Sequence, residues 1–132
     1  MPMSTSHPSR VILCVDDEPT GLAVRKMFLE SQGYRVFTAE SGAAALEVFS
    51  SEAIDLVILD YAMPEMDGGV VAEKMKALKP TIPILLLSAY INLPRETLAH
   101  VAKYVTKGES PLVLLQSIAE LLDGKSAAPS AA

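Results

Sequence analysis

The sequence predicts an α/β protein in which helices cover both faces of a parallel sheet. Short apolar runs of strand length alternate five times with segments whose apolar residues recur at helical spacing. Repeated strand-then-helix units of this kind build parallel sheets. The runs VILCV, LVIL and ILLL are apolar without a break, which is typical of strands buried on both faces.

The five apolar runs give the expected strands. These are Val11–Val15, Arg35–Ala39, Leu56–Leu59, Ile84–Leu87 and Tyr104–Thr106. Periodicity alone does not set the order of these strands in the sheet.

The segments between the runs give the expected helices, because residues three, four or seven positions apart share one helical face. The residues expected to face the core are Val24, Met27 and Phe28; Ala45, Val48 and Phe49; Val71, Met75 and Leu78; Leu98, Val101 and Ala102; and Leu115, Ile118, Ala119 and Leu122. Ser110 followed by Pro111 indicates the start of the last helix. Gly33 and Gly124 stand where the first and last helices should end.

Composition indicates one globular domain. The chain has 132 residues, half of them apolar, and a formal charge of −5, which argues against direct binding to nucleic acid. A single cysteine, Cys14, suggests a reduced cytoplasmic setting, and the apolar runs are too short to span a membrane. We expect a disordered N-terminal tail over residues 1–9, a folded domain over 10–122 and a flexible tail over 123–132.

Polar side chains follow four of the strands at the point where each strand ends. Asp16 and Asp17 follow the first strand, Asp60 the third, Ser88 the fourth and Lys107 the fifth. Carboxyl ends of parallel strands meet at one edge of a sheet, and in open α/β sheets ligands bind there. Three carboxylates beside one ammonium group need a further cation, and oxygen ligands without histidine or cysteine favour Mg²⁺.

These residues give the sequence a resemblance to the receiver domain of two-component response regulators. The matching segments are CVDDEP, LDYAMPEMDG, LLSAY and YVTK, in this order, and the resemblance covers about residues 10–122. It implies a flavodoxin-like, doubly wound, five-stranded parallel sheet of order 2-1-3-4-5, which would place Asp17 next to Asp60.

The resemblance also implies roles for the site residues. Asp60 would accept a phosphoryl group from a sensor histidine kinase or phosphotransfer protein. Asp17, Asp60 and the backbone carbonyl of Ala62 would hold Mg²⁺, with Asp16 reaching the ion through water. Lys107 and Ser88 would contact the phosphoryl oxygens, and Ser88 and Tyr104 would form the conformational switch that a downstream protein target detects. The domain would be a signalling module that assists its own phosphorylation and dephosphorylation, and not otherwise an enzyme.

Each residue also has a simpler interpretation. Asp16 or Asp17 could cap the first helix, Ser88 and Tyr104 could be ordinary strand residues, and Lys107 could be a surface lysine. Asp67 and Gly68 are typical of a turn.

Alternatives at the level of function also remain open. The chain could be a receiver taken from a larger regulator or hybrid kinase, or an interaction module that works without phosphate. A hydrolase with an aspartate nucleophile is weakly supported, because Ala62 stands where a second acid would be required.

The sequence departs from the family pattern in two places. Gly108 follows Lys107 where proline is common, which predicts a trans peptide bond and a more mobile loop. The segment between Ser88 and Lys107 is short, which predicts a weakly held fourth helix of about nine residues beginning near Pro94.

Overall fold

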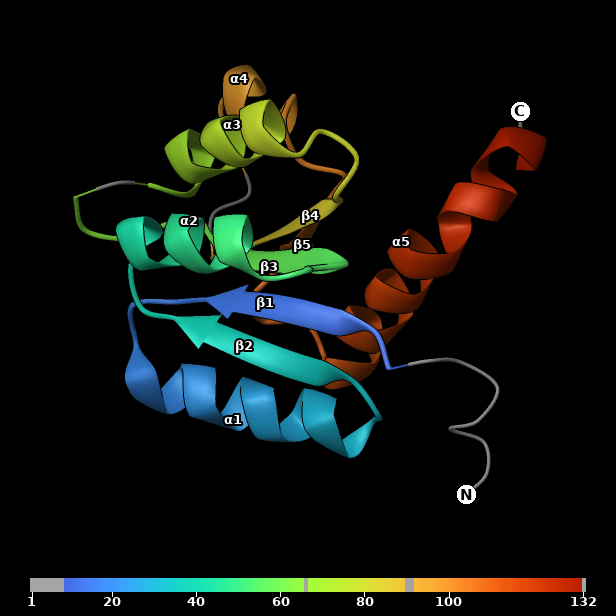
Figure 1. The fold of residues 1–132 in the computed structure, drawn as a ribbon, viewed down its shortest axis with the longest axis horizontal. Helices are drawn as coiled ribbons and strands as arrows, with labels where there is room; N and C mark the ends of the chain where they lie inside the picture. Colours follow the sequence, from blue (N-terminus) through green and yellow to red (C-terminus); the bar gives the residue numbers. More distant parts are fainter. Residues whose placement is uncertain (1–8, 66, 90–91, 132) are drawn as a thin grey trace.

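The computed structural model describes residues 9–65, 67–89 and 92–131, with side chains described as far as Asp123. One five-stranded sheet runs through it in the order β2-β1-β3-β4-β5, with every neighbouring pair parallel. The strands are β1 (Val11–Val15), β2 (Arg35–Ala39), β3 (Leu56–Asp60), β4 (Ile84–Ser88) and β5 (Lys103–Thr106). This is the flavodoxin-like topology expected from the resemblance (Figure 1).

The last residues of two central strands lie at the carboxyl edge of the sheet, where the predicted site is located. Both β3 and β4 run one residue further than the apolar pattern predicts, so Asp60 and Ser88 are strand residues. In the ladder Asp60 lies opposite Leu87, and Ser88 lies opposite Thr106. The sheet therefore fixes the backbone of both residues.

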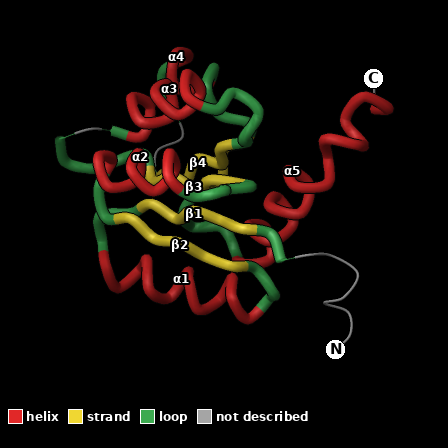
Figure 2. Tube along the Cα trace, viewed as in Figure 1, coloured by secondary structure: helices red, strands yellow, loops and turns green. Residues whose placement is uncertain are grey.

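Helices cover both faces of the sheet, as Figure 2 shows by colour. They are α1 (Pro19–Ser31), α2 (Gly42–Ser51), α3 (Gly68–Leu78), α4 (Arg95–Leu98) and α5 (Pro111–Ala131). Successive strand residues point to opposite faces, so each strand contributes to two cores. Leu13, Leu59 and Leu86 belong to the core under α2 and α3. Ile12, Cys14 and Ile58 belong to the core under α1 and α5.

Cys14 lies deep in the core under α1 and α5. Its side chain has no exposed surface, and burial raises the pKa of the thiol to about 12. The neighbouring Arg25 charge lowers this pKa and the Asp16 charge raises it, both by less than burial does. The thiol is therefore neutral at physiological pH.

The buried face of α1 differs from the predicted one. Val24 and Met27 were expected to face the core, but their side chains are 61% and 70% exposed. Leu22 and Leu29 are buried instead, and Phe28 packs at the edge of the same core. Val24 and Met27 are apolar without being buried, so the prediction from their spacing named the wrong face of α1 as the buried one.

Helices α2 and α3 largely match the prediction. Ala45 and Phe49 are buried with Val48 beside them, and Val71 and Met75 are buried. Leu78, the last residue of α3, is 54% exposed where the pattern placed it inside. The helix ends there, and its last turn leaves the side chain in solvent.

Helix α4 is shorter than predicted. It has four residues, with Pro94 as the residue before its first turn, and Thr97 is its buried residue rather than Leu98. Beyond Leu98 the backbone continues in tight turns, in which His100 N–H donates to Thr97 O and Val101 N–H to Leu98 O. Such i→i+3 bonds end an α-helix early.

Helix α5 is longer than predicted. It begins at Pro111 as expected, but its backbone stays helical through Gly124 to Ala131, and Figure 1 shows this end projecting beyond the sheet. This stretch contains several alanines, the strongest helix former, but also Gly124 and Pro129, which disfavour a helix interior by about 1 and about 3 kcal/mol, so intrinsic propensity does not explain the extension. Ile118 and Leu122 are buried, whereas Ala119 is exposed. The expected flexibility of residues 123–132 stays a prediction.

Two other expectations concern the ends of the chain and the membrane. The N-terminal tail predicted over residues 1–9 lies outside the described residues except for Ser9. Within the described residues, no helix combines the length and the hydropathy needed to cross a membrane.

Candidate functional site

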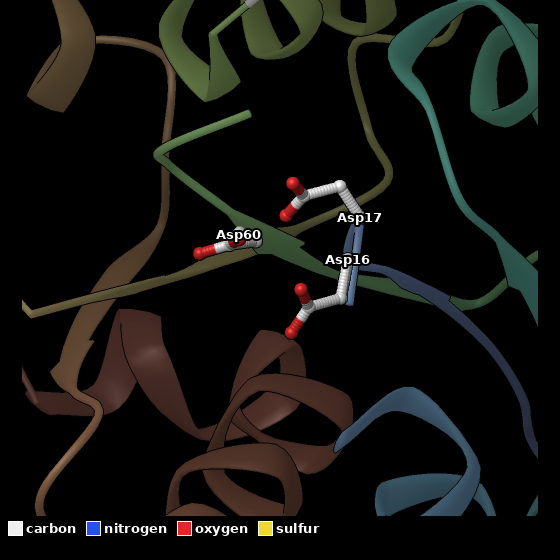
Figure 3. Close-up of side chains that lie close together, drawn as sticks. All are labelled: Asp16, Asp17 and Asp60. Carbon is white, nitrogen blue, oxygen red and sulfur yellow. The ribbon is translucent and has the colours of Figure 1, made fainter. Parts of the chain in front are cut away.

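Three carboxylates meet at the carboxyl edge of the sheet. Asp16 and Asp17 follow β1, Asp60 ends β3, and each offers an oxygen within 4.8 Å of the oxygens of the others. Figure 3 shows the three side chains gathered at the ends of the two neighbouring strands. Asp16 and Asp60 are 3% and 2% exposed, whereas Asp17 faces solvent. The sheet order brings these acids together, as the resemblance to receiver domains implied.

Lys107 is the cation nearest to Asp60. Its ammonium nitrogen lies 2.9 Å from Asp60 Oδ1 and 3.8 Å from Asp16 Oδ2. Burial raises the pKa of Asp60 above its ordinary value, the hydrogen bond and charge of Lys107 lower it, and the charges of Asp16 and Asp17 raise it further. Burial and the two acids together outweigh the single lysine, so the pKa of Asp60 stays raised.

Asp16 has a partner for each of its oxygens. Its Oδ1 accepts a hydrogen bond from Glu18 N–H at 3.0 Å, and its Oδ2 lies 3.3 Å from Arg25 NH1. The cap of α1 is Glu18, whose Oε1 accepts from Gly21 N–H at 2.8 Å. The simpler interpretation of Asp16 or Asp17 as that cap is therefore wrong.

The alternation of side chains along the strands divides the site between two faces. Cys14 and Val105 belong to the core under α1 and α5, so Asp16 and Lys107, each two residues further on, point to the same side. Ile58 belongs to that core as well, which places Asp60 on this side too. Arg25 of α1 can therefore reach the acidic cluster.

Ser88 and Tyr104 lie on the opposite face. Leu86 belongs to the core under α2 and α3, and Ser88 follows it by two residues. Tyr104 lies opposite Leu86 in the ladder and is half-buried, while Ser88 is 1% exposed. The two predicted switch residues thus point to the face of the sheet that α2 and α3 cover.

The loop after Asp60 passes very close to the strand end. A Cβ on Gly68 would lie 2.7 Å from Asp60 O and 2.8 Å from the Cα of Tyr61, so only glycine fits there. Asp67 caps α3, because its Oδ1 accepts from Val70 N–H at 3.0 Å. Ala62 is exposed in this loop, and the role of its carbonyl as a metal ligand stays a prediction.

The loop that carries Lys107 is held at its start. Lys107 N–H donates to Ser88 O at 2.9 Å, and the Lys107–Gly108 peptide bond is trans, as predicted. A Cβ on Gly108 would meet nothing within 4 Å. Greater mobility of this loop stays a prediction.

The donor set fits a hard divalent cation. The cluster supplies only carboxylate oxygens, and it carries more negative charge than Lys107 and Arg25 together balance. Burial is the main cause of the raised pKa of Asp60, and the charges of Asp16 and Asp17 add to it. Asp16, Asp17 and Asp60 can therefore hold a metal ion such as Mg²⁺.

Arg25 is a site residue that sequence reasoning missed. The pattern of α1 placed Val24 and Met27 inward, which left no reason to expect either residue between them at the site. The side chain of Arg25 is only 16% exposed. The one signal in the sequence was a lone arginine on the helix that follows the acidic pair.

Residues 12–119 match the family described as the response regulator receiver domain. The chain is 37% identical over 121 residues to the transcriptional regulatory protein GlrR of Escherichia coli, covering 89% of this chain and 27% of that protein. It is 35% identical over 125 residues to the sensor protein GacS of Pseudomonas syringae, covering 89% of this chain and 14% of that one. The chain thus spans about a quarter or less of these curated relatives.

Solved structures agree with this match. The response regulator TrrA of Thermotoga maritima, in complex with Mg²⁺ and BeF, superposes with a TM-score of 0.82 at 37% identity, covering 86% of this chain and 99% of that one. A CheY-like receiver domain from Methanospirillum hungatei gives 0.83 at 29% identity, covering 90% and 98%.

Proposed function

Because the chain belongs to the receiver domain family of two-component response regulators, we propose that Asp60 accepts a phosphoryl group from a phosphohistidine. The donor would be a sensor histidine kinase or a phosphotransfer protein. The observation that carries this proposal is the buried Asp60 carboxylate at the end of β3, within hydrogen-bonding distance of Lys107 and beside two further acids.

The chemistry assigns a role to each group. A carboxylate oxygen of Asp60 attacks phosphorus, the bond from phosphorus to the histidine nitrogen breaks, and an acyl phosphate forms. Phosphoryl transfer depends mainly on positioning and on neutralising charge. A bound Mg²⁺ would supply positive charge at the phosphoryl oxygens, and Asp17, Asp60 and the Ala62 carbonyl would hold it, with Asp16 at one water's distance.

Lys107 would supply a positive charge from the chain itself at the phosphoryl group. Its ammonium group already lies 2.9 Å from Asp60 Oδ1, so a short shift would bring it to a phosphoryl oxygen. Ser88 ends the neighbouring strand β4, and its hydroxyl would donate to another phosphoryl oxygen. Movement of Ser88 would then draw Tyr104 inward on the face that both residues share.

The output would be a change in protein binding. With a formal charge of −5, the receiver itself is a poor ligand for nucleic acid, so its effect would pass through a protein target. The GlrR relative is a transcriptional regulator and the GacS relative a sensor protein, so either kind of longer protein could carry such a domain. We place the domain in the cytoplasm, because a free, buried Cys14 is compatible with a compartment that keeps thiols reduced.

Mass spectrometry tests the proposal. The protein is incubated with Mg²⁺ and a small phosphodonor such as acetyl phosphate, and intact mass is followed. Wild type should gain one phosphoryl group that hydroxylamine removes, and Asp60→Asn should gain none. Asp67→Asn, which changes an exposed aspartate at the cap of α3, is the matched control and should label like wild type. Equal labelling of Asp60→Asn would overturn the assignment.

A further inference from the structure

Arg25 brings a second cation to the acidic cluster. Its guanidinium lies 3.3 Å from Asp16 Oδ2, and the two side chains are 16% and 4% exposed. The other oxygen of Asp16 accepts the Glu18 N–H. Both oxygens of this carboxylate are therefore engaged within the protein itself.

The charge of Arg25 is permanent, since a guanidinium does not lose its proton in proteins. Arg25 and Lys107 together oppose three carboxylates, whereas Lys107 alone would leave one more negative charge unbalanced. A cation that approaches Asp16 meets both the repulsion of Arg25 and competition for Oδ2. Both effects lower the affinity of the site for a cation.

The surroundings of Arg25 allow its side chain to withdraw. It lines a cavity of about 520 Å³ between α1 and α5, whose walls also include Phe28, Val105 and Leu114. Lys107 lines the same cavity. The guanidinium can thus leave Asp16 and move into this space while its aliphatic stem stays on apolar surface.

We infer that Arg25 is a positioning residue that holds Asp16 and sets the Mg²⁺ affinity of the site below the value the three acids alone would give. This inference rests on the proposed Mg²⁺ site. It concerns a residue on α1 that touches neither the phosphoacceptor nor the proposed direct ligands in the described contacts.

The test compares three variants by calorimetric titration with Mg²⁺. Arg25→Met should bind Mg²⁺ about 3- to 30-fold more tightly than wild type, as expected for removal of one charge a few ångströms from a partly buried site. Arg25→Lys keeps the charge and should lie between the two. Lys26→Met is the matched control, because it removes the same charge from the next residue, whose ammonium pairs with Glu30 Oε2 at 2.7 Å. It should stay within about twofold of wild type.

Thermal unfolding gives a second readout. In EDTA, Arg25→Met should melt below Lys26→Met, because buried Asp16 has lost one of its two cationic partners, and the difference should shrink as Mg²⁺ saturates the site. Should Arg25→Met fail to fold in EDTA, Arg25→Gln supplies the same charge change with a polar side chain.

The outcomes separate this inference from the proposed function. Equal Mg²⁺ affinities for Arg25→Met and Lys26→Met, with binding intact in wild type, would overturn the role of Arg25 alone. Absence of Mg²⁺ binding in wild type would instead remove the metal site on which the inference rests.

Discussion

Lys107 Nζ lies 2.9 Å from Asp60 Oδ1 although the strands that carry the two residues are not neighbours. In the sheet β4 lies between β3 and β5, so the lysine reaches across the end of β4, where Ser88 is buried. A long side chain is needed to span a strand in this way. The pairing therefore brings the ends of β3 and β5 together across the end of β4.

Stability should depend on pH through Asp60. Its folded-state pKa is raised, so between about pH 4, the ordinary carboxyl value, and that raised pKa the native state binds more protons than the unfolded state. The free energy of unfolding should therefore fall as pH rises through this window in metal-free buffer. The free energy of unfolding of Asp60→Asn should not fall in this window, so the variant should be more stable than wild type at pH values above it. Denaturant unfolding at a series of pH values measures the effect, with Glu73→Gln on the exposed side of α3 as the control. Parallel curves for wild type and Asp60→Asn would contradict it.

Removal of Asp17 should have opposite effects with and without metal. Asp17→Asn relieves repulsion within the cluster, so in EDTA it should raise stability slightly, by at most about 1 kcal/mol because the side chain faces solvent. The same change should abolish the stabilisation that Mg²⁺ gives to wild type. Melting curves with EDTA and with Mg²⁺ test both parts. An unchanged or lower melting temperature in EDTA would argue against close packing of the acids.

Two glycines near the site should respond differently to alanine. Gly68→Ala would place a Cβ against the backbone of Asp60 and Tyr61 and should cost about 1–3 kcal/mol of stability, with slower phosphorylation because the strand end must shift. Gly108→Ala meets open space and should be neutral or stabilising by up to about 1 kcal/mol. Denaturant unfolding and phosphorylation rates of the two variants make the comparison. A tolerated Gly68→Ala would show that this loop is less tightly placed.

The contact between α3 and α4 should appear as an energetic coupling. A Cβ on Gly69 would lie 2.5 Å from Thr97 Oγ1, so Gly69→Ala should destabilise the protein by about 1–3 kcal/mol. In Thr97→Ala the obstructing hydroxyl is absent, and adding Gly69→Ala there should cost less. A double-mutant cycle from unfolding curves measures the coupling. Strictly additive effects would mean that the two helices adjust independently.

The segment around α4 should exchange its amide hydrogens faster than α5. It contains one short helix with one buried residue, Thr97, whereas α5 buries Ser117, Ile118 and Leu122. Binding of Mg²⁺ with beryllofluoride as a phosphoryl mimic should change protection within residues 92–103. Hydrogen exchange with mass spectrometry reads both effects. Equal protection of the two segments in both states, or changes confined to other parts of the chain, would rule out α4 as the responsive element.

Much of the fold could be predicted because the central strands have a clear sequence pattern. Val11–Val15 and the strands near Leu56 and Ile84 are apolar without interruption, which fixes them as buried parallel strands. Their order came only from the resemblance to receivers, since periodicity carries no information on neighbours. The acids at the strand ends could be predicted for the same reason, because a parallel sheet gathers its carboxyl ends on one edge.

The remaining errors arise where local pattern and tertiary contact disagree. Val24 and Met27 are apolar but exposed, so the pattern predicted the wrong buried face of α1 and gave no indication of Arg25. Thr97 is polar but buried against α3, so the pattern of α4 named the wrong residue. Helix α5 continues past Gly124 although Gly124 and Pro129 both disfavour a helix, and local pattern does not predict this. For α1 and α4 the deciding contacts join residues from different elements.

Because Cys14 is buried, chemical labelling of its thiol can report how often the core on one side of the sheet opens. A thiol whose pKa is raised to about 12 reacts with a disulfide reagent only when the core under α1 and α5 opens, so the labelling rate in the native protein measures how often that happens. Because the chain has a single cysteine, every labelled molecule reports the same event. Cys14 stands two residues before Asp16 of the acidic cluster, so ions that stabilise the cluster should slow the labelling, and no cysteine has to be introduced to measure it.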